Sequence, residues 1–326
     1  MKKVSVIMPM YNAEKVMSRS VHSLFAQTLK DFEVIFVNDC STDNTVTELK
    51  NIISRVQRND ISVKIISHDQ NRGVACARNT GLDNAKGKYV YFLDADDYFE
   101  PYALSTLYEN ALLYDADIIG CEWLLSFRNN ARHMTQPEVK SGRDAFEKMC
   151  YGVMRWNLWL FLVKRDLYEK NQISFIPEAN MGEDMMVMMK LLLSAGRIHI
   201  IHSPLYHYIQ TNSDALTKNF AACHRQISQN VLELEKYCSK RNVAGLVGLI
   251  NQLKLNLKLP LLISSNRTNY KLWQEWFPES NAFIGMNPLQ PLRTKIIQRL
   301  AAKKCYIPIQ LYYIFVIKFV YGVIYK

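Results

Sequence analysis

The sequence predicts an α/β fold in which a mostly parallel β-sheet is covered by helices on both faces. In the first hundred residues, short apolar runs alternate with stretches of helical spacing or helix-compatible composition. Continuous apolar runs separated by helices are typical of strands that are buried on both faces, as in parallel sheets. Apolar residues make up 49% of the 326-residue chain and charged residues 21%, which indicates a globular protein with enough material for a large core.

The expected elements follow one another in strict alternation. The strands are expected at residues 4–8, 32–38, 63–67 and 89–93. The helices are expected between them, at residues 13–26, 45–57 and 73–85. Basic residues precede the first apolar run, but the run breaks at Pro9 and no small-residue cleavage site follows, which favours a strand over a signal peptide.

Polar residues follow each expected strand. They are Pro9, Tyr11 and Asn12, then Asn38, Asp39 and Ser41, then Asn71, Arg72 and Gly73, and finally Asp94, Ala95 and Asp96. Because ligands of such sheets bind in the crevice beyond the carboxyl ends of the strands, all four loops are expected to face one site. The chain has neither a G-x-G-x-x-G segment after the first strand nor a G-x-x-x-x-G-K-S/T segment, so a nucleotide would have to be held by other means.

Three of the residues near this edge have side chains that suit a nucleotide. Tyr11 offers an aromatic face for a base, and Asp39 can accept a hydrogen bond from a pyrimidine imide. Arg78, on the helix that leaves the crevice, can meet the base or the diphosphate. Each has a simpler alternative, because Tyr11 could be a core aromatic, Asp39 part of an Asx turn or helix cap, and Arg78 a solvated side chain.

Three carboxylates stand within four residues directly after the fourth expected strand, at Asp94, Asp96 and Asp97. Like charges this close repel one another, and each further carboxylate would titrate upward unless a divalent cation or a basic partner offset the repulsion. The sequence therefore indicates a cation site. The alternative is a turn in which an Asp caps the following helix.

Four segments, in this order and at this spacing, resemble the family 2 glycosyltransferases. They are VSVIMPMYN at residues 4–12, FEVIFVNDCSTD at residues 32–43, NRGVACARNTG at residues 71–81 and GKYVYFLDADD at residues 87–97. Looser similarity continues through residues 159–208, and nothing beyond about residue 217 resembles the family. The resemblance implies a Rossmann-like nucleotide-diphospho-sugar transferase (GT-A) sheet, to which a C-terminal helical extension is added.

The resemblance also implies roles for single residues. Asp39 matches the acidic residue that contacts the base, and Arg78 matches the arginine near the base and phosphates. Pro9 and Tyr11 match the loop that lines the nucleotide. The residues expected to bind the nucleotide-sugar are Pro9, Tyr11, Asn12, Asp39, Arg72, Arg78, Asp94, Ala95 and Asp96.

A divalent metal, Mn²⁺ or Mg²⁺, is the cofactor that the resemblance implies. In the family, the second Asp of an Asp-x-Asp pair binds the metal while the first lies by the ribose, and Asp96 and Asp94 match these positions. Asp97 is expected to be structural. His207 is a further candidate for a metal or phosphate contact, with a structural histidine as the alternative.

A second acidic site lies downstream at Glu183 and Asp184, where an apolar helix is expected to begin. From the pattern alone, these carboxylates are favourable charges at a helix amino terminus. The resemblance implies instead that Asp184, with Glu183 beside it, matches the motif whose Asp is the catalytic base of inverting members. Such a base deprotonates the acceptor hydroxyl as it attacks the anomeric carbon opposite the leaving group.

An aromatic stretch lies between the two acidic sites and contains Trp156, Trp159 and Phe161. It could stack on an acceptor sugar, but residues 159–163 also read as a buried strand, which favours core packing. Phe161 stands where the family often has a basic residue, and Ile209 stands where it often has an arginine. Contacts with the acceptor and the diphosphate therefore cannot be transferred from the family at these positions.

The expected organisation has three parts. Residues 1–100 form the nucleotide-sugar-binding half, residues 101–217 the acceptor-binding half of the same catalytic domain, and residues 218–326 a helical extension. No acidic residue follows Glu279, although seven basic ones do, and residues 306–325 are almost wholly apolar and aromatic. This combination predicts a peripheral contact with the inner face of a membrane, with a core helix or an oligomer contact as the alternatives.

The sequence thus predicts an inverting, metal-dependent glycosyltransferase. It would move a sugar from a nucleotide-diphosphate donor, expected to be a UDP-sugar, to a saccharide or lipid-linked saccharide in cell-surface polysaccharide synthesis such as capsule or lipopolysaccharide. The alternatives are a sugar-phosphate nucleotidyltransferase, whose glycine-rich loop is absent, and a non-catalytic glycosyltransferase-like binding protein. Seven scattered cysteines predict a reducing cytosol, and no nucleic-acid motif accompanies the net charge of +10.

Overall fold

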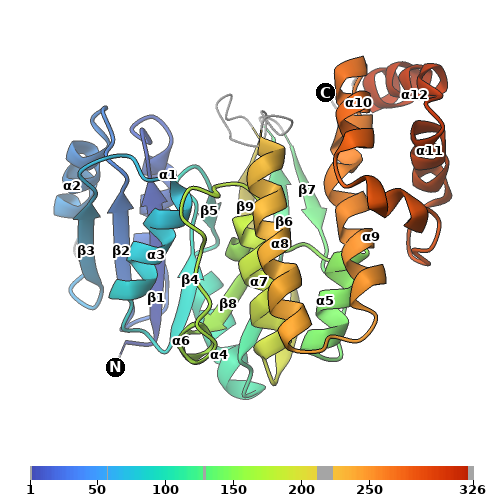
Figure 1. Cartoon of the computed structure of the whole chain (residues 1–326). Coiled ribbons are helices and arrows are strands. Elements are labelled where there is room, and N and C mark those ends of the chain that lie inside the picture. Colours follow the sequence, from blue (N-terminus) through green and yellow to red (C-terminus); the bar gives the residue numbers. More distant parts are fainter. Residues whose placement is uncertain (1, 57, 128–129, 211–222, 322–326) are drawn as a thin grey trace. The chain divides into compact units, whose positions relative to one another are not determined.

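The computed structural model describes residues 2–56, 58–127, 130–210 and 223–321 (Figure 1). The chain divides into two compact units. Unit 1 consists of residues 1–146, 156–215 and 226–234, and unit 2 consists of residues 147–155, 216–225 and 235–326. The expected donor half at residues 1–100 and acceptor half at residues 101–217 both fall largely in unit 1, and their separate roles remain predictions.

Unit 1 is built on one sheet, which in the described residues has nine strands in the order β3-β2-β1-β4-β8-β6-β9-β5, with β7 paired to β6. The strands are β1 (Val4–Met10), β2 (Glu33–Asn38), β3 (Ser62–Ser67), β4 (Tyr89–Phe92), β5 (Tyr98–Phe99), β6 (Ile118–Ser126), β7 (Ala131–Met134), β8 (Phe161–Lys164) and β9 (Ile198–Ile209). The four strands expected from the apolar runs are confirmed as β1 to β4, with ends that differ by one or two residues.

The pairing changes across the sheet. Strands β1 to β4 are mutually parallel, as the buried apolar runs predict, and lie side by side in Figure 1. Strand β8 is antiparallel to both β4 and β6, which makes β6 parallel in direction to β4. Strand β9 is parallel to β6 and antiparallel to β5. The predicted α/β fold is confirmed, and its parallel half is completed by a mixed half.

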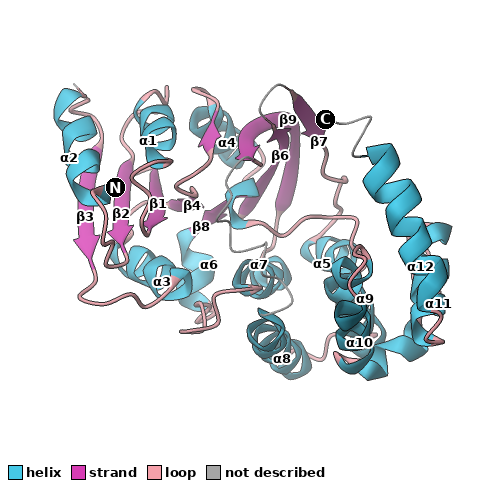
Figure 2. Cartoon of the chain, turned by 90° about the horizontal axis from the view of Figure 1, so that it is seen from above, coloured by secondary structure: helices cyan, strands magenta, loops and turns pink. Residues whose placement is uncertain are grey.

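Helices cover both faces of this sheet, as predicted. Helices α1 (Met17–Phe25), α2 (Thr45–Arg55) and α4 (Ala103–Leu113) lie on one face. Helices α3 (Val74–Asn84), α6 (Arg165–Lys170) and α7 (Glu183–Ser194) lie on the other (Figure 2). The remaining helices that include unit 1 residues are α5 (Gly142–Cys150) and α8 (His224–Lys240).

The core of unit 1 lies between the sheet and these helices. Ile7 and Phe36 on neighbouring strands are both fully buried. Helix α3 approaches β1 very closely, because a Cβ at Gly81 would lie 2.2 Å from Cγ2 of Ile7. A larger residue at that position would push the helix off the sheet. This contact fixes α3, and with it the arginine at its centre, against the carboxyl half of the sheet.

One local expectation is wrong. Residues 159–163 were expected to form one buried strand, but Trp159 lies in a 3₁₀ turn, η1 (Leu158–Leu160), and strand β8 begins only at Phe161. Both aromatic side chains are nevertheless buried. Trp159 stacks on Tyr206 and Tyr208, with ring centroids 4.3 and 5.5 Å apart. These contacts favour core packing over sugar stacking for Trp159 and Phe161, while Trp156 is partly exposed.

Unit 2 is helical, which confirms the predicted helical C-terminal part. Its elements are α9 (Leu246–Lys258), η3 (Leu259–Leu262), α10 (Arg267–Glu275), η4 (Pro278–Phe283), α11 (Leu292–Ala302), α12 (Tyr306–Tyr312) and the π-helix η5 (Tyr313–Tyr321). Their core includes the fully buried Leu253, Tyr270 and Trp273. None of the helices in the described residues combines the length and apolar character needed to cross a membrane.

Candidate active site

The loops after β1 and β2 meet at the carboxyl edge of the sheet. The backbone N–H of Asn12 donates to Oγ of Ser41 over 3.0 Å, and the side chain of Asn12 accepts from the backbone N–H of Thr42 over 2.8 Å. Asn12 has a φ of 48°, a conformation that Asn tolerates better than most residues. The predicted nucleotide-binding residue Asn12 therefore joins two loops, in the position where a ligand-binding edge is expected.

Tyr11 and Pro9 lie at the same edge. Tyr11 is 50% exposed, so the alternative of a core aromatic is wrong, and its ring is available at the surface. Pro9 belongs to β1 itself and is paired with Val37 of β2. Pro9 is therefore part of the sheet, whereas the exposed ring of Tyr11 can contact a ligand.

Asp39 lies directly after β2 and is held by three donors. His68 Nδ1 contacts its Oδ1 at 2.6 Å, the backbone N–H of Arg72 donates to Oδ1 over 2.9 Å, and that of Gly73 donates to Oδ2 over 2.7 Å. The sequence placed Asp39, Arg72 and Gly73 at one edge, and the structure brings them into contact. It did not single out His68, whose position directly after the third strand was the available signal.

The start of α3 is joined to the segment that precedes α7. Gly73 has a φ of 83°, and a Cβ there would lie 2.1 Å from the side-chain nitrogen of Asn180. Oδ1 of Asn180 accepts a hydrogen bond from the backbone N–H of Ala75 over 3.0 Å. Glycine is therefore required at position 73 both for its backbone conformation and for the space it leaves.

Asn230 of α8 holds the same segment from another side. It is fully buried, and its amide nitrogen donates to the carbonyl oxygens of Ala179 and Met181 over 3.2 and 3.0 Å. These two carbonyls stand just before Glu183 and Asp184. The acidic pair is therefore positioned by contacts with both α3 and α8.

Arg78 connects the two acidic sites. Its Nη1 donates to Oε1 of Glu183 and to Oδ1 of Asp184, both over 2.6 Å, and its Nη2 donates to Oδ1 of Asp94 over 3.3 Å. The guanidinium also lies near the rings of Phe92 and Phe175, 5.8 and 5.7 Å from their centroids. We call Arg78, Asp94, Glu183 and Asp184 the arginine clasp.

This arrangement excludes one alternative for Arg78, a solvated side chain, while a contact with the base or diphosphate stays a prediction. Arg78 is 4% exposed, and its two terminal nitrogens contact carboxylates. Burial acts to lower the pKa of Arg78, whereas the charges of Asp184, Glu183 and Asp94 raise it, with a net upward shift. Arg78 is therefore a permanent cation that neutralises part of an acidic cluster.

The clasp contains more negative than positive charge. The pKa of Asp94 is raised to about 6: burial and the nearby Asp184 and Asp96 raise it, and Arg78 lowers it. Burial and the neighbouring Asp184 likewise raise the pKa of Glu183, against the opposing effect of Arg78. A single guanidinium thus leaves the site short of positive charge, which is the electrostatic condition that a cation would satisfy.

Asp184 is the more open member of the acidic pair. Its side chain is 15% exposed, against 9% for Glu183. One oxygen contacts Arg78, and the other is 3.4 Å from the backbone nitrogen of Leu158. Of the two carboxylates, Asp184 is therefore the more accessible to a hydroxyl group from outside.

Asp97 connects the acidic loop after β4 to strand β9. It is 1% exposed, and it accepts hydrogen bonds from the hydroxyl group of Tyr206 over 2.8 Å and from the backbone N–H of Ile209 over 2.7 Å. Burial, followed by the charges of Asp94 and Asp96, raises the pKa of Asp97 well above its ordinary value. Its contacts are those of a structural residue.

The residues present fit a divalent cation that is completed by a ligand. In the described residues, no three or more His, Cys, Asp or Glu side chains are arranged to hold a metal by themselves. Asp94 and Asp96 supply carboxylate oxygens at the end of β4, and Mg²⁺ characteristically binds one or two carboxylates together with substrate phosphates and waters. The charge excess around Asp94 agrees with such a site.

His207 has protein partners on both ring nitrogens. Nε2 contacts Oε1 of Glu100 at 2.8 Å, and Nδ1 lies 3.4 Å from Oγ of Ser126. The imidazole also stacks on Tyr98, with ring centroids 4.1 Å apart. Metal or phosphate binding by His207 would require one of these contacts to break, so the alternative of a structural histidine fits the geometry better.

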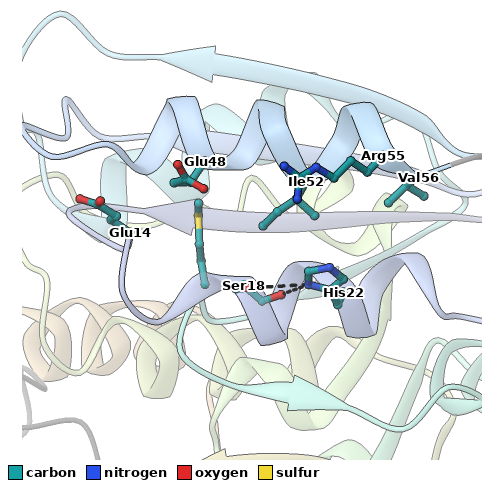
Figure 3. Close-up of a pocket in the computed structure, with 8 residues that line it drawn as sticks. Glu14, Ser18, His22, Glu48, Ile52, Arg55 and Val56 are labelled. Carbon is teal, nitrogen blue, oxygen red and sulfur yellow. Dashed lines mark hydrogen bonds between the residues drawn. The ribbon is translucent and has the colours of Figure 1, made fainter.

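A separate cavity of about 320 Å³ lies between α1 and α2 (Figure 3). Residues that line it include Glu14, Ser18, His22, Glu48, Ile52 and Arg55. None of its lining residues belongs to the arginine clasp, and none is Asp39 or one of the residues that contact the Asp39 carboxylate. The charged groups around it are mixed in sign, and His22 is already bonded to the carbonyl oxygen of Ser18 over 2.6 Å.

The chain is similar in sequence to known glycosyltransferases. Two curated relatives are the uncharacterized glycosyltransferase EpsJ of Bacillus subtilis, 30% identical over 223 residues, and the poly(ribitol-phosphate) beta-N-acetylglucosaminyltransferase TarS of Staphylococcus aureus, 30% identical over 215 residues. The matches cover 66% and 64% of this chain. They span 63% of EpsJ and 35% of TarS.

Solved structures agree on the fold. The chain matches S. aureus TarS 1–349 in complex with UDP-GlcNAc with a TM-score of 0.69 and 21% identity, covering 95% of this chain and 91% of that one. It also matches the mannosyltransferase PcManGT from Pyrobaculum calidifontis in complex with GDP-Man and Mn²⁺, with a TM-score of 0.53, 18% identity and coverage of 95% and 83%. The sequence model described as "Glycosyl transferase family 2" matches residues 5–192, which include the whole arginine clasp, Asp39 and the three residues that contact the Asp39 carboxylate, and the chain belongs to this family.

Proposed function

We propose that the protein is an inverting, metal-dependent glycosyltransferase that moves a sugar from a nucleoside-diphosphate donor to a saccharide or lipid-linked saccharide in cell-surface polysaccharide synthesis. The observation that carries this proposal is the arginine clasp, which brings the acidic loop after β4 and the acidic start of α7 onto one guanidinium. The family supports the reaction type. The solved TarS complex with UDP-GlcNAc supports a UDP-sugar as donor.

In this proposal the acidic start of α7 supplies the base, and the acidic loop after β4 holds the metal. Asp184 accepts the proton of the acceptor hydroxyl as that oxygen attacks the anomeric carbon from the face opposite the diphosphate. Arg78 holds Asp184 in place through its 2.6 Å contact. Asp94 and Asp96 would hold the divalent metal, which when bound neutralises charge on the leaving diphosphate. Asp39 and Tyr11 would hold the nucleoside end.

Release of nucleoside diphosphate tests the reaction type. Incubation of the protein with a UDP-sugar and Mn²⁺ should release UDP slowly without an acceptor and faster with one. Release of diphosphate or nucleoside monophosphate would support a nucleotidyltransferase instead. A failure to turn over UDP-, GDP- or other nucleotide-sugars with any saccharide acceptor would favour the non-catalytic alternative.

The metal requirement is tested at Asp96. We expect Asp96→Asn to raise the Mn²⁺ concentration for half-maximal turnover by roughly 10- to 100-fold, because loss of an interaction that supports a metal costs at least this much affinity. Asp83→Asn is the matched control, since Asp83 is an exposed carboxylate on α3. Titration of activity with Mn²⁺ after treatment with a chelator measures the effect. A wild-type enzyme that keeps full activity in the chelator would contradict the metal proposal.

We also propose that unit 2 carries the surface that contacts an anionic membrane. Ile307, Leu311, Phe315 and Phe319 are spaced four residues apart along α12 and η5, and are 63%, 49%, 63% and 66% exposed. This spacing places them along one side of the helical segment, which we call the apolar stripe. Because the chain after Glu279 has basic but no acidic residues, a negatively charged lipid surface complements the stripe better than a neutral partner.

A reducing cytoplasmic location at the inner face of the membrane is consistent with the thiols. None of the seven cysteines forms a disulfide, and Cys76, Cys121, Cys150 and Cys238 are buried. Disulfides are rare in reducing compartments, so a chain whose seven cysteines form no disulfide fits such a compartment. Synthesis there would place the enzyme next to cytoplasmic nucleotide-sugars and to acceptors carried on membrane lipids.

The apolar stripe can be tested in the full-length chain. We expect Ile307→Ser, Leu311→Ser and Phe315→Ser together to lower binding to vesicles that contain phosphatidylglycerol by at least about tenfold, because three apolar side chains leave the interface. Leu113→Ser and Val247→Ser are controls, since these residues are 74% and 70% exposed outside the stripe. Flotation of the vesicles measures binding. Equal flotation of the triple variant and the wild type would refute the stripe, and an altered oligomeric state without a change in flotation would favour a protein contact.

A further inference from the structure

We propose that His68 is a positioning residue that sets Asp39 to recognise one ring N–H of a nucleobase, and that the pair selects uracil over guanine and cytosine. The inference rests on the proposed function, since it assigns the base-binding half of the donor site. It is carried by the contacts around Asp39. The carboxylate is 2% exposed and sits between the ends of β2 and β3 and the start of α3.

The contacts of His68 fix which of its nitrogens carries the proton. Nδ1 lies 2.6 Å from Oδ1 of Asp39, and Nε2 lies 2.9 Å from Oγ1 of Thr80. A carboxylate can only accept hydrogen bonds, so Nδ1 must be the donor. In the neutral imidazole, Nε2 then accepts from the Thr80 hydroxyl group. Thr80 therefore holds the ring in the orientation in which it points its N–H at Asp39.

Both partners are shielded from solvent. The side chains of His68 and Asp39 are 6% and 3% exposed, so water competes little for this hydrogen bond. The backbone N–H of His68 also donates to the carbonyl oxygen of Asn38 over 2.9 Å, which places the imidazole beside the end of β2. His68 thus reaches Asp39 from a rigid strand end, whereas the other two donors belong to the loop before α3.

The number of donors limits what Asp39 can still accept. A carboxylate has about four lone-pair positions, two on each oxygen. In the described residues, Oδ1 accepts from His68 and from the backbone of Arg72, while Oδ2 accepts from the backbone of Gly73. One position on Oδ2 is therefore left for a ligand. A base that offers one donor fits this site, and a base that needs both oxygens does not.

The common bases differ in this respect. Uracil offers a single ring N–H between two carbonyl groups. Guanine offers a ring N–H and an adjacent amino group, which together favour both oxygens of a carboxylate, and Oδ1 is already filled by two donors. Cytosine and adenine offer an amino N–H, but beside it they present a ring-nitrogen lone pair, which the carboxylate repels. The geometry thus ranks UDP above GDP, and GDP above CDP and ADP.

Equilibrium binding to the full-length protein tests the role of His68. The probes are UDP, GDP and CDP, measured by titration calorimetry with Mn²⁺ present. We expect His68→Ala to raise the Kd for UDP by about 10- to 100-fold, the usual effect of losing a hydrogen bond to a charged group, and to leave the weak Kd for CDP nearly unchanged. The KM for a UDP-sugar should rise with it, while kcat stays within about threefold because Asp184 is untouched.

Two further variants separate positioning from mere support of the fold. His68→Asn places an amide N–H near the position of Nδ1 and should restore most of the UDP affinity. Thr80→Val removes only the partner of Nε2 and should give an intermediate loss. Equal loss in His68→Ala and His68→Asn, or a fall in kcat without a change in KM, would assign His68 a structural role and overturn the proposal.

Binding of UDP and GDP to the wild-type protein tests the proposed selectivity for uracil. Wild-type protein that binds GDP as tightly as UDP would overturn the count of acceptor positions on Asp39. Wild-type protein that binds no nucleoside diphosphate would overturn the proposed function itself. The two failures are distinguishable, because the first leaves nucleotide binding intact and the second does not.

Discussion

Replacement of Asp184 with asparagine is expected to lower turnover by about 10²- to 10⁴-fold, the range that general-base catalysis contributes, while the Kd for the nucleotide-sugar changes little. The amide keeps the shape of the side chain but cannot take a proton from the acceptor. Asp184 is partly exposed and held at 2.6 Å by Arg78, so the substitution removes a base from a site that is otherwise retained. Single-turnover rates and donor titration measure the two effects separately.

Asp166→Asn is the matched control for this prediction. Asp166 also lies in the first turn of a helix, α6, and pairs with Lys170, but it lies outside the arginine clasp. Its replacement should leave turnover within about twofold, since exposed ion pairs of this kind contribute little. Near-normal turnover of Asp184→Asn would remove Asp184 from the mechanism, and a large loss of donor binding would show that it acts on the donor side.

Replacement of Arg78 with methionine should have the largest effect on the fold as well as on activity. The guanidinium is the shared partner of three carboxylates, Asp94, Glu183 and Asp184. Removing one partner of a buried ion pair costs about 3–5 kcal/mol of unfolding free energy, because the remaining charge is left uncompensated. We therefore expect a loss of this order in denaturant unfolding, together with a turnover at least as low as that of Asp184→Asn.

The pH dependence of this loss has a definite sign. Burial raises the folded-state pKa of Asp94 and Glu183 even with Arg78 in place, and Arg78 lowers both, so its removal would raise both pKa values further. Such groups bind more protons in the folded state, so stability is regained as the pH falls below the raised pKa values and is lost as the pH rises through them. The deficit of Arg78→Met should thus shrink toward pH 4 to 5 relative to pH 7.

Arg78→Lys separates charge from geometry. A lysine keeps the positive charge but loses the planar fork that serves acids on two sides of the guanidinium. It should recover part of the stability and less of the turnover. If Arg78→Met instead raised the KM for the donor at unchanged kcat and stability, Arg78 would be a nucleotide contact, as the family resemblance implied.

The parallel half of the sheet was predictable because its signal is local. Residues 34–37, for example, are apolar throughout, which favours a strand buried on both faces, and the polar residues that follow must then lie at the carboxyl edge. This reasoning placed Asp39, Asp94 and the loop at Arg72 at one edge. The backbone of Arg72 contacts Asp39, and Asp94 contacts Arg78 on the helix that follows this loop. The helical C-terminal part was also predictable, because its apolar residues recur at helical spacing.

The partners of Arg78, the pairing of β6 with β9 and the roles of the histidines could not be predicted, because they depend on contacts between residues far apart in the sequence. The partners of Arg78 in α7 lie 105 and 106 residues away, so no local pattern distinguishes an arginine for phosphate from an arginine for carboxylates. Strand β6 pairs with β9 through an irregular register near Glu122, which interrupts the alternation that a strand signal needs. His207 and His68 were equally ambiguous, because a histidine becomes a ligand or a structural group only through its neighbours.

The contacts of Asn230 bear on how this chain can be divided. The family match ends at residue 192, and the resemblance fades near residue 217, yet residues 226–234 belong to unit 1. Asn230 donates to the two carbonyls that precede the acidic pair of α7. A shortened chain that ends at residue 217 would keep every residue of the arginine clasp and lose one of the anchors that positions it. The smallest active fragment should therefore be sought beyond the end of the family match, with α8 retained.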